Sequence, residues 1–260
     1  MRLNSKREMK RMNLLKYIFV SVLILITNLQ TFAQIKISFP SKDSVIITAD
    51  WYPVADSLPI ILLCHQARFS RGEFQGTAEK LNKFGFNCLA VDLRAGGEVN
   101  GVANETASYV RRNKLPSSYL AAEQDIIAAM DFLYNKYRKK IILLGSSYSA
   151  SLALIIANEN DHVLGVAAFS PGEYLEPKDY VSKHIEGLNK PVFITSSKEE
   201  APGVTDLVKD VVSMIKIQYI PMSEGDHGSK VLWNEKPYNE EYWLALMSFL
   251  NRMKKIEHPE

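Results

Sequence analysis

Cysteine is scarce in this sequence. The 260 residues include only Cys64 and Cys88, and neither belongs to a cysteine and histidine cluster with metal-ligand spacing. Both lie in apolar runs, one near the end of a predicted strand and the other near the start of the next. Parallel neighbouring strands would keep the two thiols apart, so we expect no disulfide. The sequence therefore excludes a small disulfide scaffold and predicts no metal site.

Internal repeats, coiled-coil heptads and low-complexity tracts are also absent. The composition, 47% hydrophobic and 23% charged, is typical of a globular domain with one large core. Residues 1–33 hold six Lys or Arg and one acidic residue, and without them the formal net charge changes from +2 to −3. Because the basic excess belongs to that segment, the charge pattern does not indicate a nucleic-acid partner.

The N-terminus has the features of a targeting segment. Six basic residues precede an apolar run at 17–26, and Thr31 and Ala33 are the small residues expected before a cleavage site. The apolar run is too short to span a bilayer comfortably. We therefore predict a signal peptide over residues 1–33, cleaved near Ala33, and an exported mature domain over 34–260, periplasmic or secreted. An uncleaved anchor is the alternative.

Strand and helix patterns alternate along the rest of the chain. A hairpin is predicted at 35–39 and 44–52, and residues 96–117 read as a loop or short insertion. Further strands are predicted at 59–64, 86–93, 141–144, 163–169, 191–195 and 217–222, with helices at 73–84, 119–137, 150–157, 180–188, 205–215 and 239–255. This order predicts an α/β fold: a mostly parallel eight-stranded sheet, helices on both faces and no large lid.

The strand at 141–144 leads into a helix through Gly145-Ser146-Ser147-Tyr148-Ser149. A sharp strand-to-helix turn tolerates only small neighbours and exposes the hydroxyl at its apex above the sheet. This pattern identifies Ser147 as a candidate nucleophile. Ser149 stands where the usual G-x-S-x-G pattern has its last glycine, and a plain polar loop is the alternative reading.

Loops after other strands supply a base and an acid for Ser147. His227 lies between Gly225 and Gly228 after the last strand, where it can act as a general base. A carboxylate after the strand at 191–195 would orient the imidazole, with Glu199 preferred and Glu200 as the alternative. His65 has a different reading, as a hydrogen-bonded residue that shapes the loop after its strand.

Acyl transfer also needs donors for the negative charge that develops on the carbonyl oxygen. The backbone N–H of Tyr148 is one candidate, and Ala67, or less favourably Gln66, supplies the other from the loop after the strand at 59–64. Arg68 and Arg94, together with Arg71, are candidates for holding a substrate carboxylate.

The arginines also have a purely structural reading. Arg94 would then pair with Asp92 or Glu98, while the other arginines of this region would face water.

These motifs resemble those of serine α/β-hydrolases, and more narrowly of the small, lidless dienelactone-hydrolase-like group. The resemblance covers about residues 35–255 and rests on GSSYS at 145–149, GDHG at 225–228, HQA at 65–67 and DLR at 92–94. It implies ester, thioester or related acyl substrates, a Ser/acid/His triad and no cofactor. Gln66 departs from the glycine usual in the group, and a glutamate stands where aspartate is commoner. Dienelactone hydrolases proper use a cysteine nucleophile, so Ser147 argues against carrying over their substrate.

The resulting hypothesis is an exported, carboxylesterase-like serine hydrolase that acts on a small-molecule acyl substrate. A small serine peptidase of the same fold is the first alternative, although no propeller domain is present to restrict access. The second is an inactive hydrolase fold that serves as a binding protein.

Overall fold

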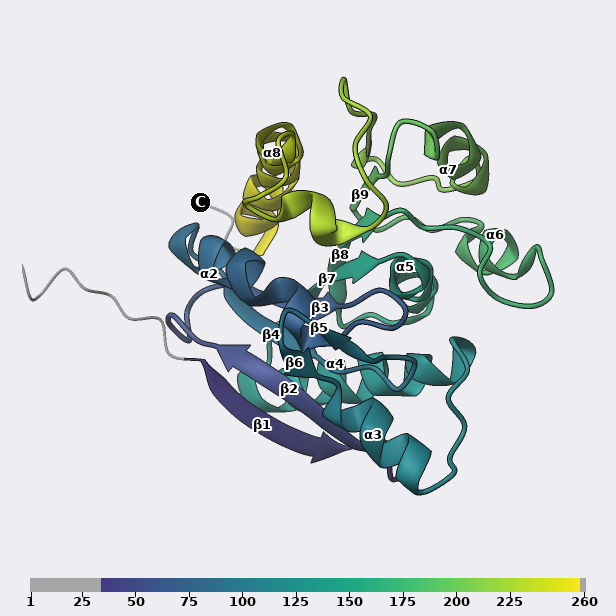
Figure 1. The fold of residues 1–260 in the computed structure, drawn as a ribbon. Coiled ribbons are helices and arrows are strands. Elements are labelled where there is room, and N and C mark those ends of the chain that lie inside the picture. The colour runs from purple at the N-terminus through teal and green to yellow at the C-terminus, as the bar shows by residue number, and fades with distance from the viewer. Residues whose placement is uncertain (1–33, 258–260) are drawn as a thin grey trace, which may run out of the picture. The chain divides into compact units, whose positions relative to one another are not determined.

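The computed structural model describes residues 34–257, so the predicted signal peptide lies outside the described residues. Eight strands form one sheet in the order β1-β2-β4-β3-β7-β8-β9-β10 (Figure 1). The strands are β1 (Ile35–Pro40), β2 (Ile46–Tyr52), β3 (Ile60–Cys64), β4 (Asn87–Val91), β7 (Ile141–Ser146), β8 (Val163–Phe169), β9 (Val192–Thr195) and β10 (Lys216–Tyr219). β1 and β2 pair antiparallel, and β2 also pairs antiparallel with β4. The other pairs are parallel, which confirms the predicted α/β fold.

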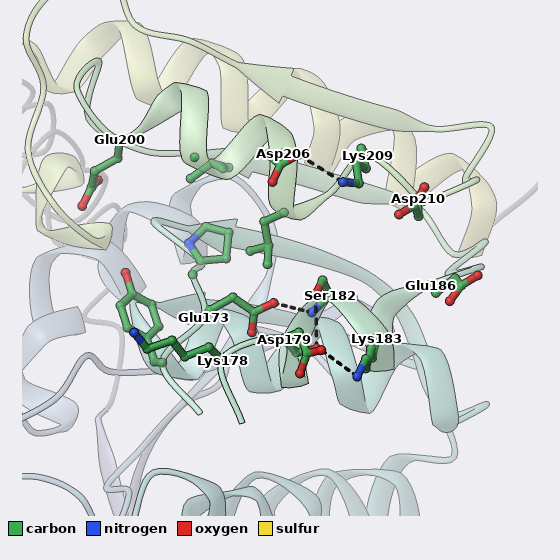
Figure 2. A pocket seen from close by; sticks show the side chains of 16 residues that line it. Glu173, Lys178, Asp179, Ser182, Lys183, Glu186, Glu200, Asp206, Lys209 and Asp210 are labelled. Atoms are coloured by element: carbon green, nitrogen blue, oxygen red, sulfur yellow. Dashed lines mark hydrogen bonds and ion pairs between the residues drawn. The ribbon is translucent and has the colours of Figure 1, made fainter. Parts of the chain in front are cut away.

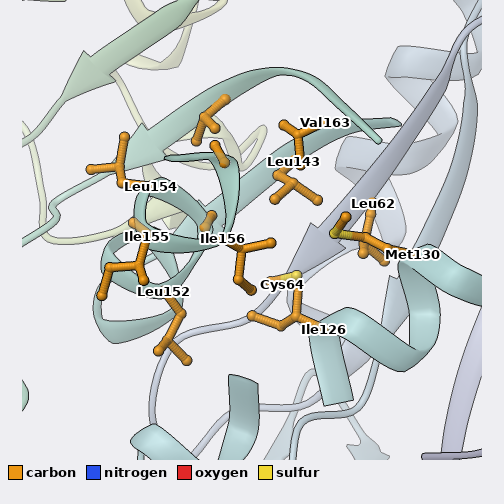
Figure 3. Close-up of a cluster of buried hydrophobic side chains, with 14 of the residues drawn as sticks. Leu62, Cys64, Ile126, Met130, Leu143, Leu152, Leu154, Ile155, Ile156 and Val163 are labelled. Carbon is orange, nitrogen blue, oxygen red and sulfur yellow. The ribbon is translucent and has the colours of Figure 1, made fainter. Parts of the chain in front are cut away.

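Helices cover both faces of the sheet (Figure 1). They are α2 (Gln75–Lys83), α3 (Glu105–Arg112), α4 (Glu123–Tyr137), α5 (Tyr148–Glu159), α6 (Tyr180–Ile185), α7 (Ala201–Leu207) and α8 (Asn239–Glu257). Because successive side chains of a strand point to opposite faces of the sheet, each central strand contributes side chains to two hydrophobic cores. Leu62 and Leu143 face a cluster with α4 and α5 (Figure 3), whereas Ile61 and Ile142 face a cluster with α2 and α8.

The central strands show why the two cysteines stay apart. Cys64 ends β3 and pairs in register with Val91, while Cys88, near the start of β4, pairs with Ile61. Both thiols are buried and free, as predicted. Burial raises the pKa of each thiol well above its ordinary range.

The segment at 96–117 has more structure than its polar sequence predicts. It forms a two-stranded hairpin, β5 (Glu98–Val99) and β6 (Val102–Ala103), followed by α3. The Asn104 side chain caps α3 by accepting a hydrogen bond from the N–H of Ala107 at 2.7 Å. Asn104 also donates to the carbonyl oxygen of Leu93 at 2.9 Å, so tertiary contacts order this segment.

The segment after β9 also differs from its prediction. The sequence predicts a helix over 205–215, but α7 begins four residues earlier, immediately after Glu200. Residues 196–200 therefore form a short connection between β9 and α7, which stays near the carboxyl end of β9. The parallel strands β3, β7, β8 and β9 all direct their carboxyl ends to the same edge of the sheet, where the following loops meet.

Within residues 34–257, no helix is both long and apolar enough to cross a bilayer.

Candidate active site

Ser147 occupies the turn between β7 and α5. Its backbone has φ 61° and ψ −125°, a conformation that costs free energy for any residue other than glycine. Its N–H donates to the carbonyl oxygen of Phe169 at 2.8 Å, which holds the turn against β8. Gly145 is required here, because a Cβ at that position would lie 2.5 Å from the Cα of Ala150. The sequence motif thus corresponds to a strained turn whose apex is Ser147.

Ser149 has a structural function that its small size alone does not indicate. Its hydroxyl donates to the carbonyl oxygen of Cys64 at 2.7 Å and accepts from the N–H of Ser146 at 2.9 Å. The side chain is fully buried. The serine that replaces the usual glycine therefore connects the end of β3 to the end of β7.

The loop after β10 brings His227 to Ser147. The Nε2 atom of His227 lies 2.8 Å from the hydroxyl oxygen of Ser147. Gly228 follows with φ 76°, and a Cβ there would lie 2.5 Å from the side-chain oxygen of Gln66. The glycine next to His227 therefore lets this loop approach the one after β3.

Glu200, not Glu199, contacts the imidazole. The Nδ1 atom of His227 hydrogen-bonds to Oε1 of Glu200, whereas Glu199 is exposed to solvent. Glu199 and Glu200 are consecutive residues of the turn that precedes α7, with Glu200 as the N-cap, and of the two side chains only that of Glu200 reaches the imidazole. The sequence-based preference for Glu199 is corrected accordingly.

The other carboxylate oxygen of Glu200 is also occupied. Oε2 accepts from the hydroxyl of Ser170 at 2.7 Å and from the N–H of Ser197 at 3.1 Å. Burial raises the pKa of Glu200, but the hydrogen bonds from His227 and Ser170 outweigh it and lower this pKa to about 2. Glu200 is therefore ionised at neutral pH and favours a proton on Nδ1 of His227.

The two predicted oxyanion donors lie beside Ser147. Tyr148 is the first residue of α5, where a backbone N–H has no acceptor within the helix. In the loop after β3, the N–H of Gln66 donates to Glu73 at 2.8 Å and is therefore not available to a substrate. Ala67 is the next residue and lines the same pocket as Ser147 and Tyr148.

That pocket has a volume of about 410 Å³ and a largely aromatic wall. Its lining residues are Gln66, Ala67, Arg68, Phe69, Tyr119, Ser147, Tyr148, Tyr174 and His227. The rings of Tyr119 and Tyr148 stack with centroids 4.4 Å apart, and Tyr174 packs edge-on to the imidazole of His227. An apolar acyl group of modest size suits such a wall.

The predicted substrate-binding arginines have different environments. Arg68 is exposed at the rim of the pocket. Arg94 is only 2% exposed and pairs with Asp125 and Asp43, each at 2.7 Å. Arg94 therefore cannot contact a substrate in this pocket, and that prediction is wrong. Its structural reading, an ion pair, is correct, although the partners are not Asp92 or Glu98. Arg71 does not face water as that reading expected: it is buried and pairs with Asp92 at 2.7 Å and Asp50 at 3.0 Å.

His65 lies at the end of β3 with both ring nitrogens engaged. Nδ1 lies 2.7 Å from the carbonyl oxygen of Gln66, and Nε2 accepts from the N–H of Leu93 at 2.8 Å. Burial lowers the pKa of His65 to about 4, which keeps the ring neutral. His65 thus shapes the loop after its strand, in line with the reading from sequence.

A larger groove of about 620 Å³ adjoins this pocket between α6 and α7 (Figure 2). Tyr174 lines both hollows, and Glu200 lies at one end of the groove. The Tyr174 hydroxyl donates to the carbonyl oxygen of Ser170 at 3.0 Å, which holds the ring at the boundary. Among residues 34–257, no three His, Cys, Asp or Glu side chains are grouped to hold a metal ion.

Comparison with known proteins identifies the family and the fold of this chain. The sequence profile of the Dienelactone hydrolase family matches residues 45–231. This chain belongs to the dienelactone hydrolase family. It is a hydrolase of the α/β-hydrolase fold, as the sequence motifs predicted. No curated protein matched the chain in a sequence search.

Solved structures resemble this family member in fold. The esterase Pf2001 of Pyrococcus furiosus superposes with a TM-score of 0.67 at 19% identity, covering 86% of this chain and 94% of its own. A dienelactone hydrolase of Anabaena variabilis gives 0.64 at 16%, covering 85% and 97%. An acylaminoacyl peptidase of Pyrococcus horikoshii gives 0.64 at 15%, covering 91% of this chain but 44% of its own.

Two residues at this site, Tyr174 and Glu73, were not predicted from the sequence. Tyr174 follows Ser170-Pro171-Gly172 in a loop without a recognisable motif, and contacts in the folded structure identify it: it packs against His227 and lines both hollows. Glu73 lies at the start of a predicted helix, where an acidic residue is ordinary. Its contacts to the site come entirely from the tertiary fold.

Proposed function

We propose that this protein is an exported serine hydrolase that cleaves a small ester or related acyl substrate through Ser147, His227 and Glu200. The continuous chain of contacts from Glu200 through His227 to Ser147 carries the proposal. Each role follows from position: Glu200 fixes the imidazole, the free Nε2 lone pair faces the hydroxyl, and the strained turn presents that hydroxyl.

The reaction would follow two acyl-transfer steps. Ser147 Oγ attacks the carbonyl carbon while His227 Nε2 takes its proton, and the N–H groups of Tyr148 and Ala67 stabilise the oxyanion. The tetrahedral intermediate collapses to an acyl-enzyme, and the imidazolium returns the proton to the departing alcohol. Water then repeats the sequence, with His227 as base, and releases the carboxylic acid.

The pocket supports a small acyl group rather than a polymer. Its volume of about 410 Å³ and its aromatic wall suit an apolar acyl chain, and Arg68 at the rim offers a guanidinium to an acid-bearing substrate. The predicted signal peptide supports export.

A serine-directed fluorophosphonate probe and a short p-nitrophenyl ester test this function on the mature chain, residues 34–260. We expect labelling and ester hydrolysis in the wild type and loss of both in Ser147→Ala. Mass spectrometry would place the label on Ser147. An unlabelled, inactive wild type that is folded by circular dichroism would contradict the proposal and favour a binding protein.

A small peptidase is the second candidate, because the fold also resembles that of the Pyrococcus horikoshii acylaminoacyl peptidase. Matched ester and anilide substrates with the same acyl group separate the two activities. Faster turnover of the anilide would replace the esterase proposal with the peptidase.

A further inference from the structure

Glu73 is a buried carboxylate to which the proposed reaction assigns no role. It is 1% exposed, and its side chain contacts Gln66, which lines the active-site pocket. An ionised group in such a place costs several kcal/mol of desolvation unless hydrogen bonds compensate. The partners of Glu73 therefore indicate why the chain keeps a carboxylate here.

Those partners come from three of the segments that form the site. Oε2 of Glu73 accepts from the N–H of Gln66 at 2.8 Å, and Oε1 accepts from the hydroxyls of Ser146 at 2.8 Å and Ser229 at 2.6 Å. The N–H of Ser229 in turn donates to the hydroxyl oxygen of Ser146 at 2.8 Å. One carboxylate thus joins segments that are far apart in the sequence.

Each partner is one or two residues from a group of the proposed triad or oxyanion site. Ser146 precedes the nucleophile directly, and Gln66 precedes the oxyanion donor Ala67. Ser229 follows His227 by two residues. A small shift at any partner moves a reacting group, and a displacement of about 1 Å can cost about a hundredfold in rate.

A second contact fixes the position of Glu73 itself. The indole N–H of Trp233 donates to the backbone carbonyl oxygen of Glu73 at 2.8 Å. The Trp233 ring also stacks on Phe69, which lines the catalytic pocket, with centroids 6.3 Å apart. The backbone of Glu73 is thereby held by the segment after His227, in addition to the hydrogen bonds of its side-chain oxygens.

We propose that Glu73 is a positioning residue of this hydrolase: its ionised carboxylate holds the nucleophile turn, the oxyanion loop and the histidine loop in one geometry. This inference rests on the proposed function, because positioning has a consequence only where Ser147, His227 and Ala67 react. Three donors point at the two oxygens of Glu73, and an ionised carboxylate accepts from all of them, whereas the protonated acid would need an acceptor for its own O–H.

Glu73→Gln is the first test, since it keeps the shape and removes the charge. We expect kcat for a p-nitrophenyl ester at pH 8 to fall about tenfold to a hundredfold with KM changed less than threefold. A purely structural role predicts an unchanged kcat for the folded fraction. Asp125→Asn is the matched control, because Asp125 is an equally buried carboxylate that bonds to Arg94 instead of the three loops.

The pH dependence separates positioning by charge from a general packing defect. Burial raises the pKa of Glu73, while its hydrogen bonds from Ser229, Gln66 and Ser146 act against the rise. A protonated glutamic acid resembles glutamine in shape and charge. We therefore expect the ratio of kcat in Glu73→Gln to that in the wild type to rise toward one as pH falls. A ratio independent of pH would overturn the proposal.

Hydrogen exchange tests the same idea without an activity assay. In Glu73→Gln we expect faster amide exchange in peptides over 65–70 and 226–232, and unchanged exchange over β1 and β2. If the wild type hydrolyses no ester, this measurement still reports whether Glu73 holds the loops, so the two failures are distinguishable. Equal exchange in both proteins would refute the positioning role.

Ser229→Ala is a milder variant in case Glu73→Gln fails to fold. It removes one donor and leaves the carboxylate with two, so we expect a loss of about threefold to tenfold in kcat. Combined with Glu73→Gln, its effect should be less than multiplicative because both changes break the same network. Fully multiplicative losses would mean that the two residues act separately, contrary to the proposal.

Discussion

Replacing Glu200 with glutamine should nearly abolish turnover without unfolding the hydrolase. The hydroxyl of Ser170 and the N–H of Ser197 both donate to the same oxygen of Glu200. Those two donors would hold the carbonyl oxygen of a glutamine on their side and turn its NH₂ toward Nδ1 of His227. The imidazole would then carry its proton on Nε2, facing Ser147, and could not act as a base.

The size of this effect follows from the tautomer. In serine proteases, replacing the triad carboxylate with an amide costs about 10⁴-fold in kcat. At about 1.36 kcal/mol for each factor of ten, a loss of 10³ to 10⁴ corresponds to about 4 to 5.5 kcal/mol of transition-state stabilisation. We therefore expect Glu200→Gln to retain about 0.01% to 0.1% of wild-type kcat.

Steady-state hydrolysis of a p-nitrophenyl ester measures this loss. Glu199→Gln is the matched control, because Glu199 is the exposed neighbour of Glu200, and its kcat should stay within about twofold of wild type. Circular dichroism and urea unfolding check that both variants are folded. An active Glu200→Gln together with an inactive Glu199→Gln would refute the assignment of the acid.

Four further predictions each depend on the environment of one or two side chains. Ser149→Gly restores the common motif yet should lower the free energy of unfolding by about 2 to 3 kcal/mol in urea titrations, because it leaves buried partners without hydrogen bonds; an unchanged midpoint would contradict this. Cys64 and Cys88 should resist iodoacetamide in the native state and react in urea, as judged by mass spectrometry. Arg68→Ala should lower kcat/KM about twofold to fivefold for an ester with a terminal carboxylate, but not for its neutral analogue. The folded pKa of Glu200 lies below its unfolded value, so its contribution to stability should be complete above about pH 4.5 and lost as pH falls toward 2, and Glu200→Gln should lack this dependence in unfolding experiments.

Local features of the sequence were sufficient to predict the strands of the main sheet and two residues of the candidate site. Branched apolar runs separated by helical periodicities predicted all eight strands of the main sheet, because a parallel sheet with both faces covered requires such runs. Ser147 and His227 were predicted because small neighbours or flanking glycines mark tight loops after strands. These signals lie within about five residues and need no knowledge of the tertiary structure.

The assignment of charged side chains depended on contacts between distant segments. Glu199 and Glu200 are neighbouring residues of the same type, and only the path of the turn that precedes α7 decides which side chain reaches His227. Arg94 follows a strand toward the site, but Asp125 on α4 holds it in the interior.

The alternation of strand and helix patterns predicts that the loops after the parallel strands gather at one edge of the sheet, whereas the order of the strands within the sheet comes from the structure. Only the tertiary structure decided which carboxylates serve the site. The carboxylate of Glu73 receives hydrogen bonds from residues 66, 146 and 229, and no local pattern encodes such a meeting. The physical reason is that the energy of a buried charge depends on all of its surroundings, whereas a turn or a strand depends on its own few residues.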